Sequence, residues 1–262
     1  MSSLFRLPIP VLTYHRVLPC AGSITIAVDE FERQLQWLQK NGFRTLSGLE
    51  FERALRGEQD VGRAIVLTFD DGYFDNLYLA MPLLEKYGMK ALLFVITGKT
   101  KDRVERSLGA WEEKDDDCYL SWEEIDSMVT SGVFEVHSHT HSHTPLWVGE
   151  HSAVETRRAI YNDVAASIES LRNRGYTHEI QLAWPWGYFR PEWLDDLEAL
   201  GVRVCYTMRP GTNFPGADPR LIRRLSEEKF SSNKLLTAAC SPFFGVALNA
   251  VSRVWGGLRG RP

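Results

Sequence analysis

Two short stretches of the chain gather residue types that can hold a metal ion or move a proton. The first is Thr68-Phe69-Asp70-Asp71-Gly72, which overlaps the end of the strongly apolar segment 64–69. Two adjacent carboxylates repel each other unless a cation or a shared proton lies near them. Two solvated aspartates in a turn are the alternative interpretation. This pair therefore indicates a metal or proton-transfer site only in combination with further ligands.

The second stretch, residues 135–143, carries four of the seven histidines at alternate positions, namely His137, His139, His141 and His143. Neutral imidazole is the commonest protein nitrogen ligand of zinc and its neighbours, so this density favours a metal site over a solvated histidine run. The spacing does not fit the metallo-β-lactamase pattern, which needs Asp where His141 stands. It does not fit barrel amidohydrolases either, whose paired histidines lie on the first strand. What remains is His139 and His143 with one carboxylate from the first stretch.

The elements that must position these stretches alternate between apolar β-branched and amphipathic segments. Strands are predicted at 9–14, 43–46, 64–69, 91–96, 134–137, 180–184, 202–207 and 221–225. Helices are predicted at 29–40, 121–131, 152–174 and 191–200, and Asp29 with Glu32, like Ser121 with Glu124, has capping-box spacing. About eight strand–helix units predict an α/β fold, a single distorted (β/α) barrel of seven or eight strands. Its metal site would lie at the carboxyl ends of the strands.

Composition narrows the class of protein. The chain has 262 residues, a formal net charge of −4 and 24% charged residues, which are ordinary globular values that do not favour a nucleic-acid partner. Its four cysteines form no CxxC pair, which argues against a disulfide scaffold. Pro8 and Pro10 interrupt the apolar N-terminal stretch, which therefore lacks the pattern of a secretory signal. We expect a cytoplasmic protein of unknown oligomeric state.

The last part of the sequence differs from the body. After Glu228 there are five basic residues and no acidic one. Apolar residues from Phe244 to Leu258 recur at steps of three and four beside Arg253 and Arg259, as in a helix lying on an anionic membrane surface. A helix packing on the body or on a second subunit is the alternative. We therefore expect a catalytic barrel at 1–228 and a basic, apolar appendage at 229–262 that makes peripheral contact with the inner face of the membrane.

These motifs, with Trp184-Pro185-Trp186-Gly187, resemble the polysaccharide deacetylases of carbohydrate esterase family 4, the NodB-homology fold, over roughly residues 8 to 227. The resemblance implies that Asp70 is the catalytic base and that Asp71, His139 and His143 bind a divalent metal. Zn²⁺ is the first choice, with Co²⁺ or Ni²⁺ as alternatives. His137 and His141 match no ligand position of the family, so they are interpreted as lying behind the ligands or in the groove.

The residue that protonates the leaving amine departs from the commonest family pattern, a Leu-x-His motif near the C-terminus, because no histidine follows His178. The segment Leu12-Thr-Tyr-His15-Arg16-Val17 instead resembles the permuted poly-N-acetylglucosamine deacetylases, in which the acid histidine comes first. We therefore predict His15 as the acid. Ala183 stands where the family often has an arginine that orients the catalytic aspartate, which leaves that role unassigned.

The resemblance also implies the substrate and the reaction. It predicts metal-dependent hydrolysis of an N-acetylhexosamine amide in a glycan or glycolipid, such as a lipopolysaccharide core or poly-N-acetylglucosamine, with release of acetate. The residues expected to contact substrate are Tyr73, whose neighbouring backbone N–H would face the oxyanion, and Trp184, Pro185, Trp186 and Tyr188 in a sugar groove. The alternatives are a metal-dependent amidase or imidase on a small amide and a catalytically inactive sugar-binding module.

Overall fold

The computed structural model describes residues 7–103, 118–145 and 152–226, together with Thr237, Cys240, Ser241 and Asn249. Apart from these last four residues, the predicted appendage at 229–262 lies outside the described part of the chain. Within the described ranges, no helix is both long enough and apolar enough to cross a membrane.

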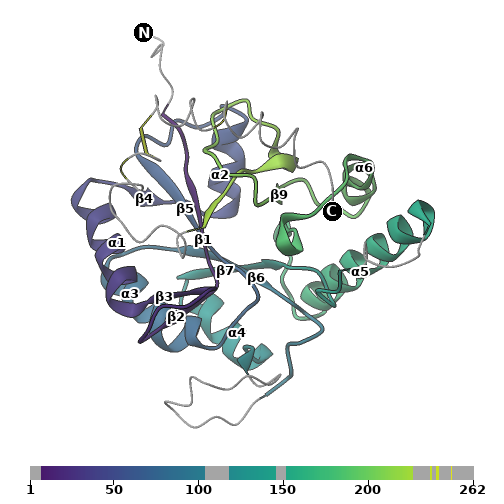
Figure 1. Cartoon of the computed structure of the whole chain (residues 1–262), viewed down its shortest axis with the longest axis horizontal. Helices are drawn as coiled ribbons and strands as arrows, with labels where there is room; N and C mark the ends of the chain where they lie inside the picture. The colour runs from purple at the N-terminus through teal and green to yellow at the C-terminus, as the bar shows by residue number, and fades with distance from the viewer. Residues whose placement is uncertain are drawn as a thin grey trace.

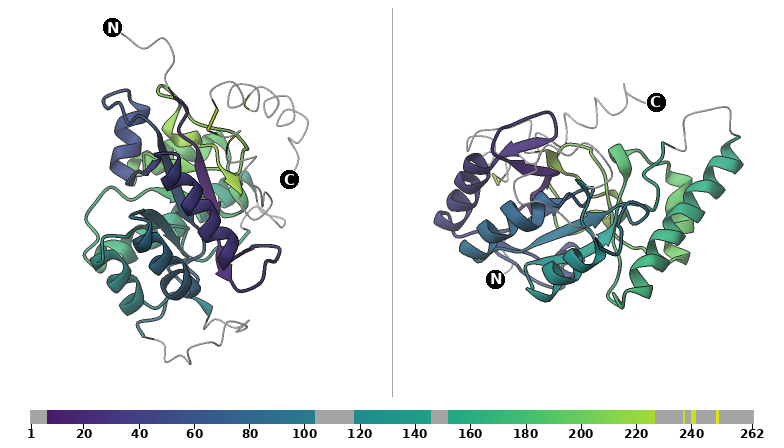
Figure 2. Two further views of the ribbon diagram at one scale, coloured as in Figure 1. Left: turned by 90° about the vertical axis from the view of Figure 1, so that its left-hand side faces the viewer. Right: turned by 90° about the horizontal axis from the view of Figure 1, so that it is seen from below.

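An eight-stranded parallel sheet curls through the molecule (Figures 1 and 2). The strand order is β10-β1-β5-β6-β7-β8-β9, with β4 paired to β5. A parallel bridge between Tyr206 and Ile222 joins the β9 edge to the segment that leads into β10, so the curl nearly closes. The strands are β1 Val11–Tyr14, β4 Arg44–Thr45, β5 Ala64–Phe69, β6 Ala91–Val95, β7 Phe134–Ser138, β8 Leu182–Ala183, β9 Cys205–Tyr206 and β10 Leu225–Ser226.

The eight predicted strands and the barrel fold are confirmed. The strands β4, β8 and β9 are shorter than predicted, and β10 overlaps the predicted strand 221–225 only at Leu225, since apolar runs report burial and not the length of the ladder. A separate parallel pair, β2 Arg16–Leu18 and β3 Thr25–Ala27, was not predicted.

Helices surround the sheet (Figure 1). They are α1 Val28–Lys40, α2 Gly48–Leu55, α3 Met81–Lys86, α4 Trp122–Thr130, α5 Ala153–Asn173 and α6 Pro191–Ala199, with short turns η1 Asn76–Ala80, η3 Pro185–Gly187 and η4 Pro219–Leu221. The capping box of Ser121 with Glu124 is confirmed. The one at Asp29 is wrong: α1 begins a residue earlier, Ala27 is its N-cap, and Asp29 pairs with Arg33 at 3.0 Å.

Alternation of side chains along the strands produces two cores and directs the site residues inward. On β5, Leu67 and Phe69 belong to the core beneath the helices, whereas Val66 belongs to the core inside the curl. The inner core includes Phe51 of α2, and the α2 N-terminus donates to Glu135 at the start of β7. Helix α2 therefore covers the amino end of the strands, and Asp70, in phase with Val66, faces the interior at the carboxyl end.

Candidate metal and catalytic site

Three predicted ligands meet at the carboxyl ends of β5 and β7. Asp71 follows β5, and His139 and His143 follow β7. The Asp71 Oδ1 lies 3.3 Å from the His139 Nε2 and 3.5 Å from the His143 Nε2. The three side chains form one of the two groups in the described chain that could hold a metal ion.

The hydrogen bonds of this triad show that it fits a cation. The His139 Nδ1 lies 2.8 Å from the Ala183 carbonyl oxygen, which can only accept, so this nitrogen carries the proton. In the neutral ring the Nε2 then presents a lone pair toward the Asp71 Oδ1. That oxygen is buried and has no hydrogen-bond partner. Two electron-rich atoms facing each other in a buried place are stabilised by a metal cation between them.

Backbone strain concentrates around the triad. In the described chain, the non-glycine residues with positive φ are Asp71 (71°), Thr140 (66°), His143 (52°) and Trp186 (54°). Asp71 and His143 are candidate ligands, Thr140 lies between His139 and His143 in the chain, and the Trp186 ring centroid is 4.2 Å from that of His143. The left-handed region costs a non-glycine residue about 1–3 kcal/mol and persists where the surroundings impose it, most often at functional sites.

Asp70 is held by an arginine that sequence reasoning did not find. The Arg224 Nη1 donates to the Asp70 Oδ1 at 2.7 Å, and the Arg224 Nε donates to the Thr207 carbonyl at 3.0 Å. Both side chains are almost fully buried, at 0% and 3% exposure. Burial opposes ionisation of Asp70, but Arg224, followed by His139 and His15, lowers the pKa of this carboxyl below its usual range. Asp70 therefore stays ionised near neutral pH.

Arg224 thus has the orienting position that Ala183 leaves vacant. It enters from the segment before β10, and β10 pairs with β1, which pairs with β5. The sequence offered one weak signal: Arg224 lies within the apolar segment 221–225 that was predicted as a strand.

His15 lies at the carboxyl end of β1, beside the two aspartates. The Asp70 N–H donates to the Tyr14 carbonyl at 2.9 Å, and the Asn76 side-chain amide donates to the His15 carbonyl at 2.9 Å. Burial raises the pKa of Asp70, and the charge of His15 is, after Arg224 and His139, among those that lower it. The structure therefore brings the predicted acid and base to the same end of the curl.

Tyr73 is clamped in an aromatic stack. Its ring lies 5.2 Å from that of Tyr119 at 17°, and the Arg16 guanidinium lies 4.9 Å from its centroid. Tyr73 and Tyr119 form an antiparallel backbone pair that shares no hydrogen bond of its own. The hydrogen bonds lie on either side of it, where the Phe74 N–H donates to the Cys118 carbonyl and the Leu120 N–H donates to the Gly72 carbonyl. In such a pair the two backbone N–H groups point away from each other. The Tyr73 N–H is therefore directed away from residues 118–120.

The aromatic motif divides into core and surface. Trp184 is 1% exposed, and its ring centroid lies 5.8 Å from that of Trp193. Pro185 is buried as well. Trp184 belongs to the core and Pro185 is buried, so neither side chain is exposed here, and their place in a sugar groove stays a prediction. Trp186, 56% exposed and next to His143, remains available to a sugar ring, and Tyr188 is half-buried near it in the chain.

A second histidine group, Glu135, His137 and His178, lies behind the triad inside the curl. Burial lowers the pKa of His137, so its ring is neutral. Its Nδ1 accepts the Gln181 N–H at 3.2 Å, which leaves the proton on Nε2, 3.2 Å from the Glu135 Oε1. The His178 Nε2 lies 2.8 Å from the Val136 carbonyl. The buried His137 Nε2 has no hydrogen-bond partner by geometry, so among the described residues this group stays a second candidate metal site. His137, 0% exposed, therefore lies behind the ligands and outside any groove.

A curled parallel sheet with one aspartate and two histidines at its carboxyl end defines a barrel protein with a candidate divalent-metal site. Residues 57–205, more than half of the chain, match the polysaccharide deacetylase family. The chain belongs to this family.

Relatives and solved structures agree with this assignment. YxkH of Bacillus subtilis is 30% identical over 204 residues, which are 78% of this chain and 65% of that protein. The poly-β-1,6-N-acetyl-D-glucosamine N-deacetylase of Escherichia coli K12 is 24% identical over 211 residues, 72% of this chain but 31% of the enzyme. The structure of IcaB from Ammonifex degensii has a TM-score of 0.72 at 29% identity and covers 84% of this chain and 91% of that one. The Streptococcus pyogenes deacetylase PplD, at 23% identity and a TM-score of 0.75, shares the fold, covering 91% and 100%.

Proposed function

We propose that the protein is a metal-dependent N-deacetylase that hydrolyses the acetamide of an N-acetylhexosamine in a glycan and releases acetate. The observation that carries this proposal is that two buried groups of side chains lie together at one edge of the sheet. One is the Asp71, His139 and His143 triad with an unsatisfied carboxylate oxygen, and the other is Asp70 held ionised by Arg224. Membership of the polysaccharide deacetylase family supports the same reaction.

Each residue has a role that follows from its contacts. A divalent cation held by the triad would supply acidity toward water and polarise the acetamide carbonyl. Asp70, ionised beside Arg224, accepts the proton of the attacking water. The Tyr73 N–H, outside the local ladder, donates to the developing oxyanion. His15 then protonates the nitrogen as the C–N bond breaks, so that the sugar leaves as an amine and the acyl group as acetate.

The donor set supports a choice of metal. Two imidazoles and one carboxylate with open positions are ligands that zinc accepts in catalytic sites, and Co²⁺ and Ni²⁺ accept the same donors. We infer Zn²⁺ as the first candidate. Reconstitution of metal-free protein with each ion, followed by acetate release, tests the order of activity.

The substrate we propose is a β-linked N-acetylglucosamine chain or a lipid-linked glycan that carries one. The surface beside the triad offers a sugar platform. Trp186 exposes its ring beside His143, and pyranose C–H faces pack on aromatic rings. The E. coli relative is named for poly-β-1,6-N-acetyl-D-glucosamine, which supports this class.

We also propose peripheral contact with the inner face of the membrane through residues 229–262. The support is the sequence alone: five basic residues and no acidic one follow Glu228. Flotation with anionic vesicles compares the full chain with a version that ends at Glu228. Stronger flotation of the full chain is expected, and equal partitioning would refute the proposal.

The test of the reaction is acetate release from chito-oligomers, poly-N-acetylglucosamine fragments and a purified core glycolipid, with zinc or cobalt added after chelation. Asp70→Asn is the matched variant, because it keeps the shape of the side chain and removes its charge. Metal-dependent release that this variant abolishes is the expected result. Intact substrates in the presence of one bound metal per chain would refute the deacetylase. Hydrolysis of a small amide or cyclic imide is then the remaining candidate.

A further inference from the structure

The segment that carries both candidate histidine ligands is a loop, so groups outside a strand ladder or a helix must hold its backbone. It comprises residues 139–144, directly after β7, and we call it the ligand loop. The His139 N–H donates to the Val95 carbonyl of β6 at 2.9 Å. The next five N–H groups donate to side-chain oxygens: Thr140 to the Ser138 Oγ, His141 and Ser142 to Asp163, His143 to the Thr140 Oγ1, and Thr144 to the Ser142 Oγ.

Asp163 differs from the other side-chain acceptors because it comes from a distant element. It lies in the middle of α5, whereas the others belong to the ligand loop or to Ser138 at the end of β7. It uses both carboxylate oxygens. The Oδ2 accepts the His141 N–H at 3.2 Å, and the Oδ1 accepts the Ser142 N–H at 3.0 Å. Asp163 therefore fixes the ligand loop relative to α5.

These two N–H groups lie between the two residues of the ligand loop that have a left-handed backbone. The φ angle is 66° at Thr140 and 52° at His143. A non-glycine residue keeps such a conformation only where its surroundings impose it. The bonds to Asp163 hold the turn between Thr140 and His143, and this turn brings the His143 ring centroid to 4.9 Å from that of His139. The separation of the two imidazoles thus depends on how this turn is held.

A second residue of α5 supports the start of the ligand loop. The Ser167 Oγ lies 2.8 Å from the Ser138 Oγ, which accepts the Thr140 N–H. Ser167 is 0% exposed. Positions 163 and 167 are one turn apart on the same face of the helix. One face of α5 therefore supports the backbone on both sides of Thr140.

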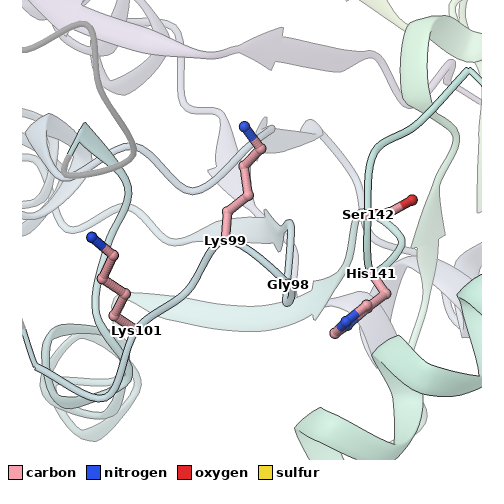
Figure 3. A pocket seen from close by; sticks show the side chains of 5 residues that line it. All are labelled: Gly98, Lys99, Lys101, His141 and Ser142. Atoms are coloured by element: carbon pink, nitrogen blue, oxygen red, sulfur yellow. The ribbon is translucent and has the colours of Figure 1, made fainter.

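The loop after β6 holds the opposite side of the ligand loop. The Gly98 N–H donates to the His141 carbonyl at 2.8 Å, and a Cβ at residue 98 would lie 2.5 Å from that oxygen. Only glycine permits this approach. Figure 3 shows Gly98 and His141 in the wall of a pocket that both loops line. The backbone at His141 is therefore held from two sides, by Gly98 and by Asp163.

We propose that Asp163 is a positioning residue for the metal site: by accepting the N–H groups of His141 and Ser142, it sets the geometry in which His139 and His143 reach the cation. Its oxygens accept backbone N–H groups, so Asp163 acts through the loop and not as a ligand. The inference rests on the proposed metal-dependent function and adds to it a residue outside the sequence motifs. Groups that orient metal ligands typically change metal affinity 10- to 100-fold when they are removed.

The experiment measures the zinc affinity of the full chain by competition with a chromophoric chelator. Asp163→Asn keeps the shape of the side chain but turns an NH₂ group toward one of the two N–H groups. We expect its zinc Kd to be about 10- to 100-fold weaker than that of wild type. Glu169→Gln is the matched control, because it removes an exposed carboxylate from the same helix, and its Kd should stay within about twofold of wild type. Equal affinities of the two variants would overturn the proposal.

A positioning role also predicts a spectroscopic change. The visible absorption of the cobalt-loaded protein reports the coordination geometry, so Asp163→Asn should alter the spectrum and Glu169→Gln should not. A residue that only stabilises the fold would lower the urea midpoint and leave the spectrum and the zinc Kd as in wild type, and that result would overturn the proposal. Ser167→Ala is the milder variant for the case in which Asp163→Asn does not fold. Its zinc Kd should weaken about threefold, and an unchanged Kd would then overturn the proposal.

Zinc affinity separates failure of this inference from failure of the reaction. A chain that binds zinc but releases no acetate refutes the proposed function, and the comparison of Asp163→Asn with Glu169→Gln still decides the positioning role. Equal affinities in a chain that releases acetate overturn the inference alone. A wild-type chain that binds no zinc would overturn both.

Discussion

Removing the guanidinium of Arg224 tests how this protein keeps Asp70, the proposed catalytic base, ionised. In Arg224→Met, Asp70 keeps its buried position and loses the partner at 2.7 Å. At that distance two unit charges attract by about 6 kcal/mol at an effective dielectric constant of about 20. Desolvation offsets much of this attraction, and measured losses for breaking one side of a buried pair are about 3–5 kcal/mol. We expect a loss of that size in the free energy of unfolding.

The assay is thermal and urea unfolding of the variant beside Arg223→Met. The control removes the neighbouring arginine, whose guanidinium lies at the surface and donates to the Pro210 carbonyl at 3.0 Å. The midpoint of the Arg224 variant should fall by about 10 °C, and that of the control by no more than about 2 °C. The double variant Asp70→Asn with Arg224→Met should lose less than the sum of the single variants, because no uncompensated charge remains.

The pH dependence follows from the sign of the Asp70 shift. Arg224 holds the pKa of Asp70 below its usual value, so this stabilisation is present above the unfolded-state pKa of about 4 and is lost as pH falls through the folded-state pKa. The stability gap between wild type and Arg224→Met should therefore be full at pH 7 and shrink in acid. We also expect kcat to fall about 100-fold, with the acid limb of kcat/KM at higher pH. Equal stability losses in the Arg223 and Arg224 variants, or strictly additive losses in the double variant, would refute the reasoning.

Three further predictions concern the groove, the metal and a buried acid. Trp186→Ala should raise KM for a glycan about tenfold with little change in unfolding free energy, whereas Trp184→Ala should cost about 3–5 kcal/mol of stability because that ring is 1% exposed. Glycan kinetics and urea unfolding measure the two effects. A large stability loss in Trp186→Ala with an unchanged KM, or a small stability loss in Trp184→Ala, would contradict the assignment of Trp186 to the surface and Trp184 to the core. Burial, then His139, lowers the pKa of His143 to about 4, so its ring is neutral above that pH. Cobalt absorbance should therefore persist as pH falls to about 5, and loss near pH 6.5 would contradict this value. Burial raises the pKa of Asp75 to about 7, so the folded state binds the extra proton. As pH rises from about 4 to 7, the free energy of unfolding of wild type relative to Asp75→Asn should fall by about 1.4 kcal/mol per pH unit. A difference that does not change with pH would contradict the raised pKa.

Local features of the sequence were enough for the strands and for the place of the candidate metal-binding residues at the strand ends. The 64–69 segment is a continuous apolar run, so it forms a buried strand, and the aspartates that follow must lie at its carboxyl end. The histidines after β7 come next to them because β6 pairs with both strands in parallel register. Short elements without such runs were missed, among them α2, although Ser47 and Glu50 form its capping box.

Tertiary structure decided the rest of the site, since those roles depend on contacts between distant segments and on backbone conformation. Asp70 and Arg224 are 154 positions apart and meet through the pairing of β10 with β1. Trp184 and Trp186 have the same side chain two positions apart, yet the positive φ at Trp186 turns one ring out of the core. Sequence pattern thus determined which residues end which strand. Only the curled sheet, in which long-range pairing and packing set the neighbours, determined which of these residues share a buried charge and which face solvent.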